Sequence, residues 1–202
     1  MSPPLLPALP VLPVLLLASG SARRADLLRA AGIPFQVAVS DVDETPEAGE
    51  SPEAMVRRLA AAKAQAVAAA HPGRAVLGAD TTVVIDDISL GKPFDAADAS
   101  RMLTALSGRT HTVLTGLCLV SPGAPGGHAS VTATLVEFAP LSPDEVAWYV
   151  ATGEPMDKAG GYAIQGIGSR FIRRIEGSYS NVVGLPVELV QVMCRAHGIQ
   201  VS

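Results

Sequence analysis

The apolar run from Ala75 to Ile85 constrains the fold most, because it holds a carboxylate, Asp80, at its centre. A nearly unbroken apolar run of this kind predicts a buried β-strand. Burying a carboxylate without a partner is costly, so Asp80 is expected to face a cation or a substrate. The alternative is an aspartate that ends the strand and caps a turn. Gly78 and Ala79 leave the adjacent backbone bare, which suits close approach by a ligand.

Strands and helices alternate along the rest of the chain. Strands are expected at residues 14–18, 35–39, 110–120, 131–138 and 171–175, and helices at 22–31, 51–70, 95–106, 142–150 and 186–197. Ser51, Asp95 and Ser142 stand where helix N-caps are expected. Residues 121–127 and 153–168 are rich in glycine and are expected to form loops. This mixed order predicts an α/β or α+β fold with one central sheet.

Composition limits the size of the protein and its partners. With 202 residues, 49% of them hydrophobic, the chain can form one domain with a sizeable core, or two small lobes that share a cleft. A net charge of −4 argues against a broad basic surface for nucleic acid but permits a small anionic ligand held by local cations. Cys118 and Cys194 lack the spacing of a zinc or redox motif, so a reducing, cytoplasmic location is expected.

The first 13 residues are rich in Leu and Pro, and we expect them to form an unstructured extension before a single domain at residues 14–202. No Lys or Arg precedes the apolar run, and its prolines would interrupt an inserting helix. We therefore expect neither a secretory signal nor a membrane anchor.

One candidate cation lies in the long helix expected at 51–70. Lys63 falls on the apolar stripe of this helix, four residues after Leu59. A lysine in such a place either extends its amine to solvent or meets an anion. Both alternatives stay open at the level of the sequence.

The turn between the first strand and the first helix offers phosphate-binding chemistry. Free N–H groups and the helix dipole favour an anion there, and arginine adds a two-pronged donor. The alternative is an ordinary serine cap with solvated arginines. The side chains concerned are Ser19, Ser21, Arg23 and Arg24.

Two later segments could also meet a nucleotide. Lys92 stands before a helix and could reach a phosphate, although a solvated loop lysine is the alternative. In the glycine-rich stretch 157–166, Gln165 could read a base edge through its amide, or the glycines could serve only as turns. The histidines show no ligand spacing, so a metal is expected to be Mg²⁺ or Mn²⁺ held by carboxylates and phosphate oxygens.

Several segments together resemble the Maf family of nucleotide pyrophosphatases, from about residue 14 to residue 189. The resemblance implies two α/β lobes around an elongated mixed sheet with a central nucleotide cleft, similar to inosine-triphosphate pyrophosphatases, and commonly a homodimer. The family usually has Pro where this chain has Ala22. The matching segments are LLLASGSARR at 15–24, VDE at 42–44, GADT at 78–81, GKP at 91–93, DKAGGYAIQG at 157–166 and VGLP at 183–186.

The resemblance also implies roles for single residues. Asp80 looks like the family's catalytic proton acceptor, and Glu44, Lys63 and Lys92 look like its helpers at the phosphates and the metal. Glu44 and Asp80 would be the protein ligands of that metal. The residues leave open whether Asp80 accepts a proton or holds the ion.

Arg23, Thr81 and Gln165 match positions at which the family branches by substrate, and their identities are similar to the branch that acts on dTTP and UTP. The implied reaction converts these triphosphates, or modified pyrimidine triphosphates, to the monophosphate and pyrophosphate. The alternatives are a 7-methyl-GTP pyrophosphatase, a nucleotidyltransferase with a second substrate, and a nucleotide-binding regulator of cell division and septum formation.

Overall fold

A seven-stranded mixed sheet is the central feature of the computed structural model, which describes residues 15–200. The strand order is β2-β1-β3-β5-β6-β7, and β4 pairs with β3. β1 is parallel to β2 and β3, and the other pairings are antiparallel. The prediction of one central sheet is confirmed, whereas the expected extension at residues 1–13 lies outside the described residues. The strands are β1 (Leu15–Ala18), β2 (Phe35–Val37), β3 (Val76–Ile85), β4 (Ile88–Leu90), β5 (Thr110–Ser121), β6 (Ala124–Phe138) and β7 (Ile172–Glu176).

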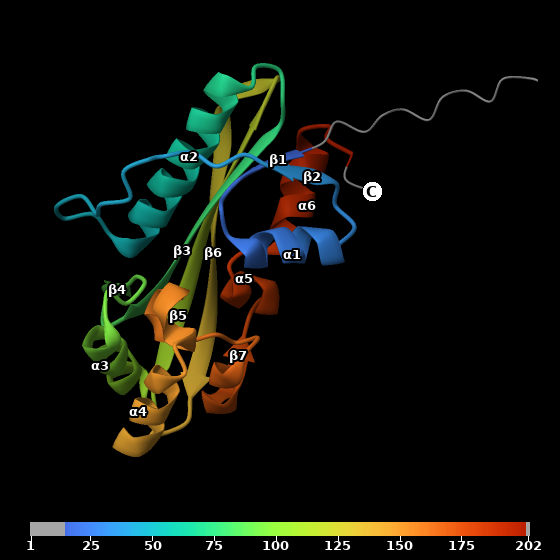
Figure 1. Cartoon of the computed structure of the whole chain (residues 1–202). Helices are drawn as coiled ribbons and strands as arrows, with labels where there is room; N and C mark the ends of the chain where they lie inside the picture. Colours follow the sequence, from blue (N-terminus) through green and yellow to red (C-terminus); the bar gives the residue numbers. More distant parts are fainter. Residues whose placement is uncertain (1–14, 201–202) are drawn as a thin grey trace, which may run out of the picture.

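Helices cover both faces of this sheet (Figure 1). Among residues 15–200, no helix combines the length and apolar character that a membrane span requires. The α-helices are α1 (Ala22–Ala30), α2 (Pro52–Ala70), α3 (Ala96–Leu106), α4 (Pro143–Ala151), α5 (Tyr179–Val183) and α6 (Val187–Ala196), and the 3-10 helices are η1 (Glu154–Asp157), η2 (Ala159–Gly161) and η3 (Ile167–Phe171).

The predicted N-caps are confirmed. The Ser51 hydroxyl accepts from the Ala54 N–H at 3.2 Å, and the Asp95 carboxylate accepts from the Asp98 N–H at 2.7 Å. Ser142 forms a reciprocal capping box at the start of α4. Each cap satisfies a backbone donor that the helix itself leaves without a partner.

The hydrophobic core is divided along the length of the sheet. At one end, α1 and α6 pack on one face and α2 packs on the other. At the other end, α3 and α4 pack against the far parts of β3, β5 and β6. Figure 1 shows these two groups of helices at opposite ends of the three long strands. The two-lobed α/β arrangement is therefore confirmed.

Two glycines allow α2 to lie directly on the sheet backbone. A Cβ atom at Gly78 would come within 2.1 Å of the Ala60 carbonyl oxygen, and one at Gly116 within 2.2 Å of the Val56 carbonyl oxygen. Any larger residue would force the helix away from the sheet. The expectation that Gly78 leaves space for a ligand is wrong, because α2 fills that space.

Other differences from the expected elements occur where side-chain pattern is weak. The expected loop at 121–127 is wrong in extent, since β6 begins at Ala124 and only residues 122–123 connect it to β5. Pro125 and Gly126 are exposed, so backbone pairing extends the strand without an apolar pattern. The stretch 153–168 is organised by 3-10 turns. β4 and α5 are too short to show periodicity.

Candidate active site

A cleft of about 830 Å³ lies at the junction of the two lobes and brings together all ten predicted site residues. A volume of this size suits a nucleotide-sized ligand. The ten residues come from the β1–α1 turn, the first turn of α1, the segment before α2, α2 itself, β3, and the loops that follow β4 and η2. They are Ser19, Ser21, Arg23, Arg24, Glu44, Lys63, Asp80, Thr81, Lys92 and Gln165.

The cleft forms beside β3 because its neighbouring strands stop short. β1 ends at Ala18, opposite Gly78, whereas β4 first pairs with β3 at Val83. In the described part of the chain, no strand covers this edge between residues 79 and 82. Side chains alternate across a strand, so Asp80 faces α2 and Thr81 faces the opposite side. Two adjacent residues thus enter different surroundings.

On the α2 side, Lys63 binds two carboxylates. Its Nζ lies 2.7 Å from Asp80 Oδ1 and 2.8 Å from Glu44 Oε1. The Lys63 and Asp80 side chains are 9% and 12% exposed, whereas that of Glu44 is 60% exposed. Lys63 therefore meets an anion and does not extend to solvent. Asp80 lies in mid-strand opposite Gly116, so the alternative of a strand-end cap is wrong.

Burial controls the charge state of Asp80. Removal from water raises the pKa of the Asp80 carboxyl, while Lys63 and Arg24 oppose this effect without cancelling it. The pKa consequently lies above the usual value for aspartate. A carboxylate with a raised pKa accepts a proton more readily, as a general base must.

On the Thr81 side, the Arg24 guanidinium is hydrogen-bonded to acceptors within the protein. Its Nε donates to the Gly184 carbonyl at 2.8 Å, and its Nη1 donates to Ser19 Oγ and the Ala79 carbonyl, both at 2.8 Å. Its Nη2 donates to Thr81 Oγ1 at 3.0 Å. The two-pronged grip on phosphate expected from sequence is not available, because four of the five guanidinium N–H groups are already bonded.

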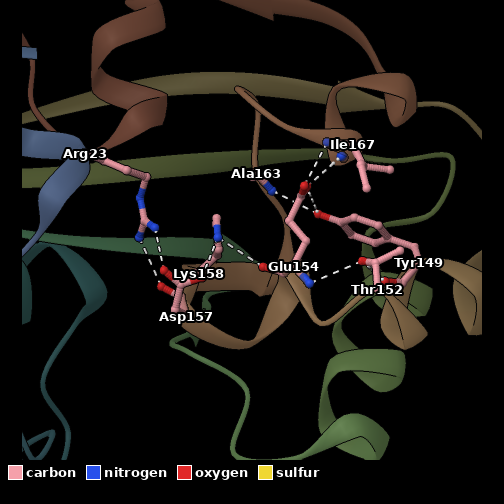
Figure 2. A network of polar contacts seen from close by, with 9 residues as sticks. Arg23, Tyr149, Thr152, Glu154, Asp157, Lys158, Ala163 and Ile167 are labelled. Carbon is pink, nitrogen blue, oxygen red and sulfur yellow. Dashed lines mark hydrogen bonds and ion pairs between the residues drawn. The ribbon is translucent and has the colours of Figure 1, made fainter. Parts of the chain in front are cut away.

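Arg23 reaches across the cleft to the other lobe. Its Nη1 donates to Asp157 Oδ2 at 2.7 Å and its Nη2 to the Asp157 carbonyl at 3.0 Å (Figure 2). Lys158 binds the same carboxylate. Hydrogen bonds from Lys158 and Arg23 lower the pKa of Asp157 to about 2. The two residues lie 134 positions apart, so no local sequence signal could have shown that Asp157 pairs with Arg23.

The remaining predicted residues are open to a ligand. Lys92 and Gln165 are exposed in the cleft, and Lys92 makes no hydrogen bond or ion pair with residues 15–200. The cleft attracts anions although the whole chain has a net negative charge, because cations outnumber carboxylates along its walls. These groups are Arg23, Arg24, Lys63, Lys92 and Lys158 against Glu44, Asp80 and Asp157.

The carboxylates fit a metal ion that is shared with phosphate. Within the described chain, no group of three or more His, Cys, Asp or Glu is placed to hold a metal alone. Glu44 and Asp80 are nevertheless brought to the same amine at the cleft wall. Mg²⁺ is commonly held by one or two carboxylates plus substrate phosphates, and this donor set suits that mode.

Known proteins are similar to this chain in sequence or in fold. A family model described as "Maf-like protein" matches residues 14–197. The chain belongs to the Maf family. Among relatives of this Maf protein, the dTTP/UTP pyrophosphatase of Symbiobacterium thermophilum is 52% identical over 187 residues, covering 91% of this chain and 94% of its own length. The dTTP/UTP pyrophosphatase of Myxococcus xanthus is 53% identical over 186 residues, covering 91% and 92%.

A solved structure supports the fold of this Maf chain. The Ham1 protein of Staphylococcus aureus aligns with a TM-score of 0.50 at 15% identity, over 91% of this chain and 98% of its own. At that identity the likeness shows a shared fold alone. It agrees with the two-lobed sheet described above.

Proposed function

We propose that this protein hydrolyses dTTP and UTP, and modified pyrimidine triphosphates of the same shape, to the monophosphate and pyrophosphate. The observation that carries the proposal is Asp80, a carboxylate of raised pKa, bound to Lys63 in a cation-rich cleft. The substrate class is supported by relatives that are more than half identical and are named for dTTP and UTP.

The phosphates are held by the cations and by the start of α1. Of the five cations that line the cleft, Lys92 makes no hydrogen bond or ion pair with the described residues, so it can bind phosphate without breaking an existing contact. Ser21 Oγ already caps the Arg24 N–H at 3.5 Å, but the N–H groups of Ala22 and Arg23 at the start of α1 have no acceptor among the described residues, and the helix dipole favours negative charge there. Ser19 and Ser21 add hydroxyl donors at the same turn.

In the chemical step, Asp80 accepts a proton from water. Lys63 occupies Oδ1, which leaves Oδ2 to take that proton. The water oxygen forms a bond to the α-phosphorus, the bond from that phosphorus to the bridging oxygen breaks, and pyrophosphate leaves. Lys63 and Lys92 offset the negative charge that develops. Of the two roles open to Asp80, we assign that of proton acceptor, because Oδ2 makes no hydrogen bond with the described residues and the side chain lines the cleft.

A divalent ion completes the proposed site. Glu44 would hold Mg²⁺ or Mn²⁺ together with phosphate oxygens while Asp80 Oδ2 takes the proton; in the alternative role of Asp80, the two carboxylates would hold the ion together. Such an ion would polarise the phosphoryl group and neutralise charge. A cytoplasmic location and a homodimer stay predictions from the sequence and the family resemblance.

Pyrophosphate release by the purified protein tests the proposal. The assay compares dTTP, UTP, CTP, GTP, ATP and 7-methyl-GTP with Mg²⁺ or Mn²⁺. Preferred turnover of dTTP and UTP is expected. Preference for 7-methyl-GTP would keep the mechanism and overturn the substrate assignment. Release that requires a sugar phosphate would favour a transferase, and binding without turnover would favour a regulator.

A further inference from the structure

The loop that presents Gln165 to the cleft is anchored by a glutamate outside the cleft. Glu154 opens η1, and its carboxylate accepts from the Ile167 and Gly168 N–H groups, both at 2.9 Å. It also accepts from the Tyr149 hydroxyl at 2.8 Å (Figure 2). One carboxylate thus binds the backbone that follows Gln165.

Tyr149 binds the same loop on the other side of Gln165. Its hydroxyl accepts from the Ala163 N–H at 3.2 Å while it donates to Glu154. The Tyr149 side chain is fully buried, and its ring packs edge-on against Phe171 at 5.0 Å. The hydroxyl therefore has a fixed position from which to hold the loop.

Glycines in the loop permit this contact. A Cβ atom at Gly166 would lie 2.3 Å from Glu154 Oε2, and one at Gly168 would lie 2.6 Å from the Tyr149 hydroxyl. The backbone can close on these two side chains only if both positions lack a side chain. The glycines on either side of Ile167 are thus matched to the Glu154–Tyr149 pair.

The pair keeps one charge state at neutral pH. Burial raises the pKa of Glu154, but hydrogen bonds from Gly168, Ile167 and Tyr149 outweigh it, so the pKa lies below the usual value. Burial and the neighbouring Glu154 raise the pKa of Tyr149. Glu154 is ionised and Tyr149 neutral, which is the arrangement that the four hydrogen bonds require.

We propose that Glu154 and Tyr149 are positioning residues for base selection, because they fix the backbone on both sides of Gln165 and so set where its amide meets the base. Neither residue lines the cleft, so neither touches the nucleotide. The inference rests on the proposed function, since it assumes that Gln165 reads a pyrimidine. It extends that function to residues that act through the loop.

The first test compares Tyr149→Phe with Gln165→Ala. Tyr149→Phe keeps the ring and removes two hydrogen bonds, so KM for UTP should rise roughly threefold to tenfold while kcat changes little. The UTP-over-CTP preference in kcat/KM should fall toward that of Gln165→Ala. The variant that combines Tyr149→Phe with Gln165→Ala should keep the same UTP-over-CTP preference as Gln165→Ala alone, because both changes act through the Gln165 amide. Tyr179→Phe, at a half-exposed tyrosine, is the matched control and should behave as wild type.

A second variant tests the acceptor itself. In Glu154→Gln, an amide N–H₂ faces backbone N–H donors, so the loop loses at least one bond, and selectivity should fall as in Tyr149→Phe. Glu188→Gln, an exposed position in α6, is its control. Equal losses for UTP and CTP, or additive losses with Gln165→Ala, would overturn the proposal.

Hydrogen exchange separates this inference from the proposed activity. Amides of Ala163, Ile167 and Gly168 should exchange at least about tenfold faster in Tyr149→Phe and Glu154→Gln without any nucleotide. If wild type hydrolyses no nucleotide, the proposed function fails, and with it the role in base selection, while faster exchange would still show the anchoring. Unchanged exchange in a folded variant would overturn the anchoring itself.

Discussion

Asp80 and Thr81 are neighbours on β3, yet the two faces they enter are built in opposite ways. Lys63 serves two carboxylates on the Asp80 face, one of them largely exposed, and leaves Asp80 Oδ2 for chemistry. On the Thr81 face, Arg24 is buried, and its donors are spent on backbone and hydroxyl acceptors. The Asp80 face keeps a carboxylate oxygen that can react, whereas the Arg24 hydrogen bonds on the Thr81 face stabilise the packing of α1 against β3. A buried charged side chain therefore indicates a chemical role only when at least one of its polar atoms, such as Asp80 Oδ2, has no bonding partner in the protein.

The strongest test of this contrast is Asp80→Asn. It removes the proton acceptor but keeps an oxygen for Lys63, so turnover of UTP should fall roughly 10²-fold to 10⁴-fold. The free energy of unfolding should change by no more than about 2 kcal/mol. Steady-state kinetics and urea denaturation measure the two quantities. Asp87→Asn, at an exposed turn, is the control, and near-normal turnover by folded Asp80→Asn would contradict the assignment.

Arg24→Met should show the reverse pattern. It keeps the bulk of the side chain but leaves buried acceptors at Ala79, Gly184 and Ser19 without their donor, which should cost about 3–5 kcal/mol of unfolding free energy. Urea denaturation measures the loss. Arg29→Met, on the exposed side of the same helix, should have little effect. If Arg24→Met were as stable as Arg29→Met, the bracing role of Arg24 would be wrong.

Gly116→Ala tests how the Asp80 face is assembled. The added methyl would meet the Val56 carbonyl, so α2 must move, at a cost of about 1–3 kcal/mol. Because Lys63 belongs to α2, the contact with Asp80 should weaken, and kcat should fall along with stability. Gly123→Ala, where a methyl group meets nothing within 4 Å, is the control. Destabilisation with kcat unchanged would show that the Lys63 contact does not depend on this packing.

Asp157→Asn should have the smallest effect, because its ion pair with Arg23 is exposed. The expected loss is at most about 1 kcal/mol of stability at neutral pH. The folded pKa of about 2 lies below the ordinary value, so the contribution is present above pH ~4 and disappears as pH falls toward 2. Melting temperatures of wild type and variant should therefore differ near neutrality and converge at acid pH. A difference that persists at pH 2 would point to another cause.

The sequence by itself determined every strand except β4, every α-helix except α5, and ten of the residues that line the cleft. Burial of apolar side chains and local backbone hydrogen bonds stabilise strands and helices, and both leave a pattern in neighbouring residues. The elements β3 and α2 and the caps Ser51, Asp95 and Ser142 were therefore predictable. Resemblance to the Maf family placed Lys63, Asp80, Lys92 and Gln165 in one site.

Tertiary structure alone decided which of these side chains can still bind a ligand and which are already hydrogen-bonded within the protein. Arg23 and Arg24 are adjacent and look alike in sequence, yet one crosses to Asp157 and the other is held by Ala79 and Gly184. Gly116 and Glu154 had no visible role, because their partners lie on other elements of the fold. The local sequence pattern reflects interactions between residues close in the chain. The hydrogen-bond partner of each donor and acceptor instead depends on atoms from distant parts of the chain, which only folding brings together.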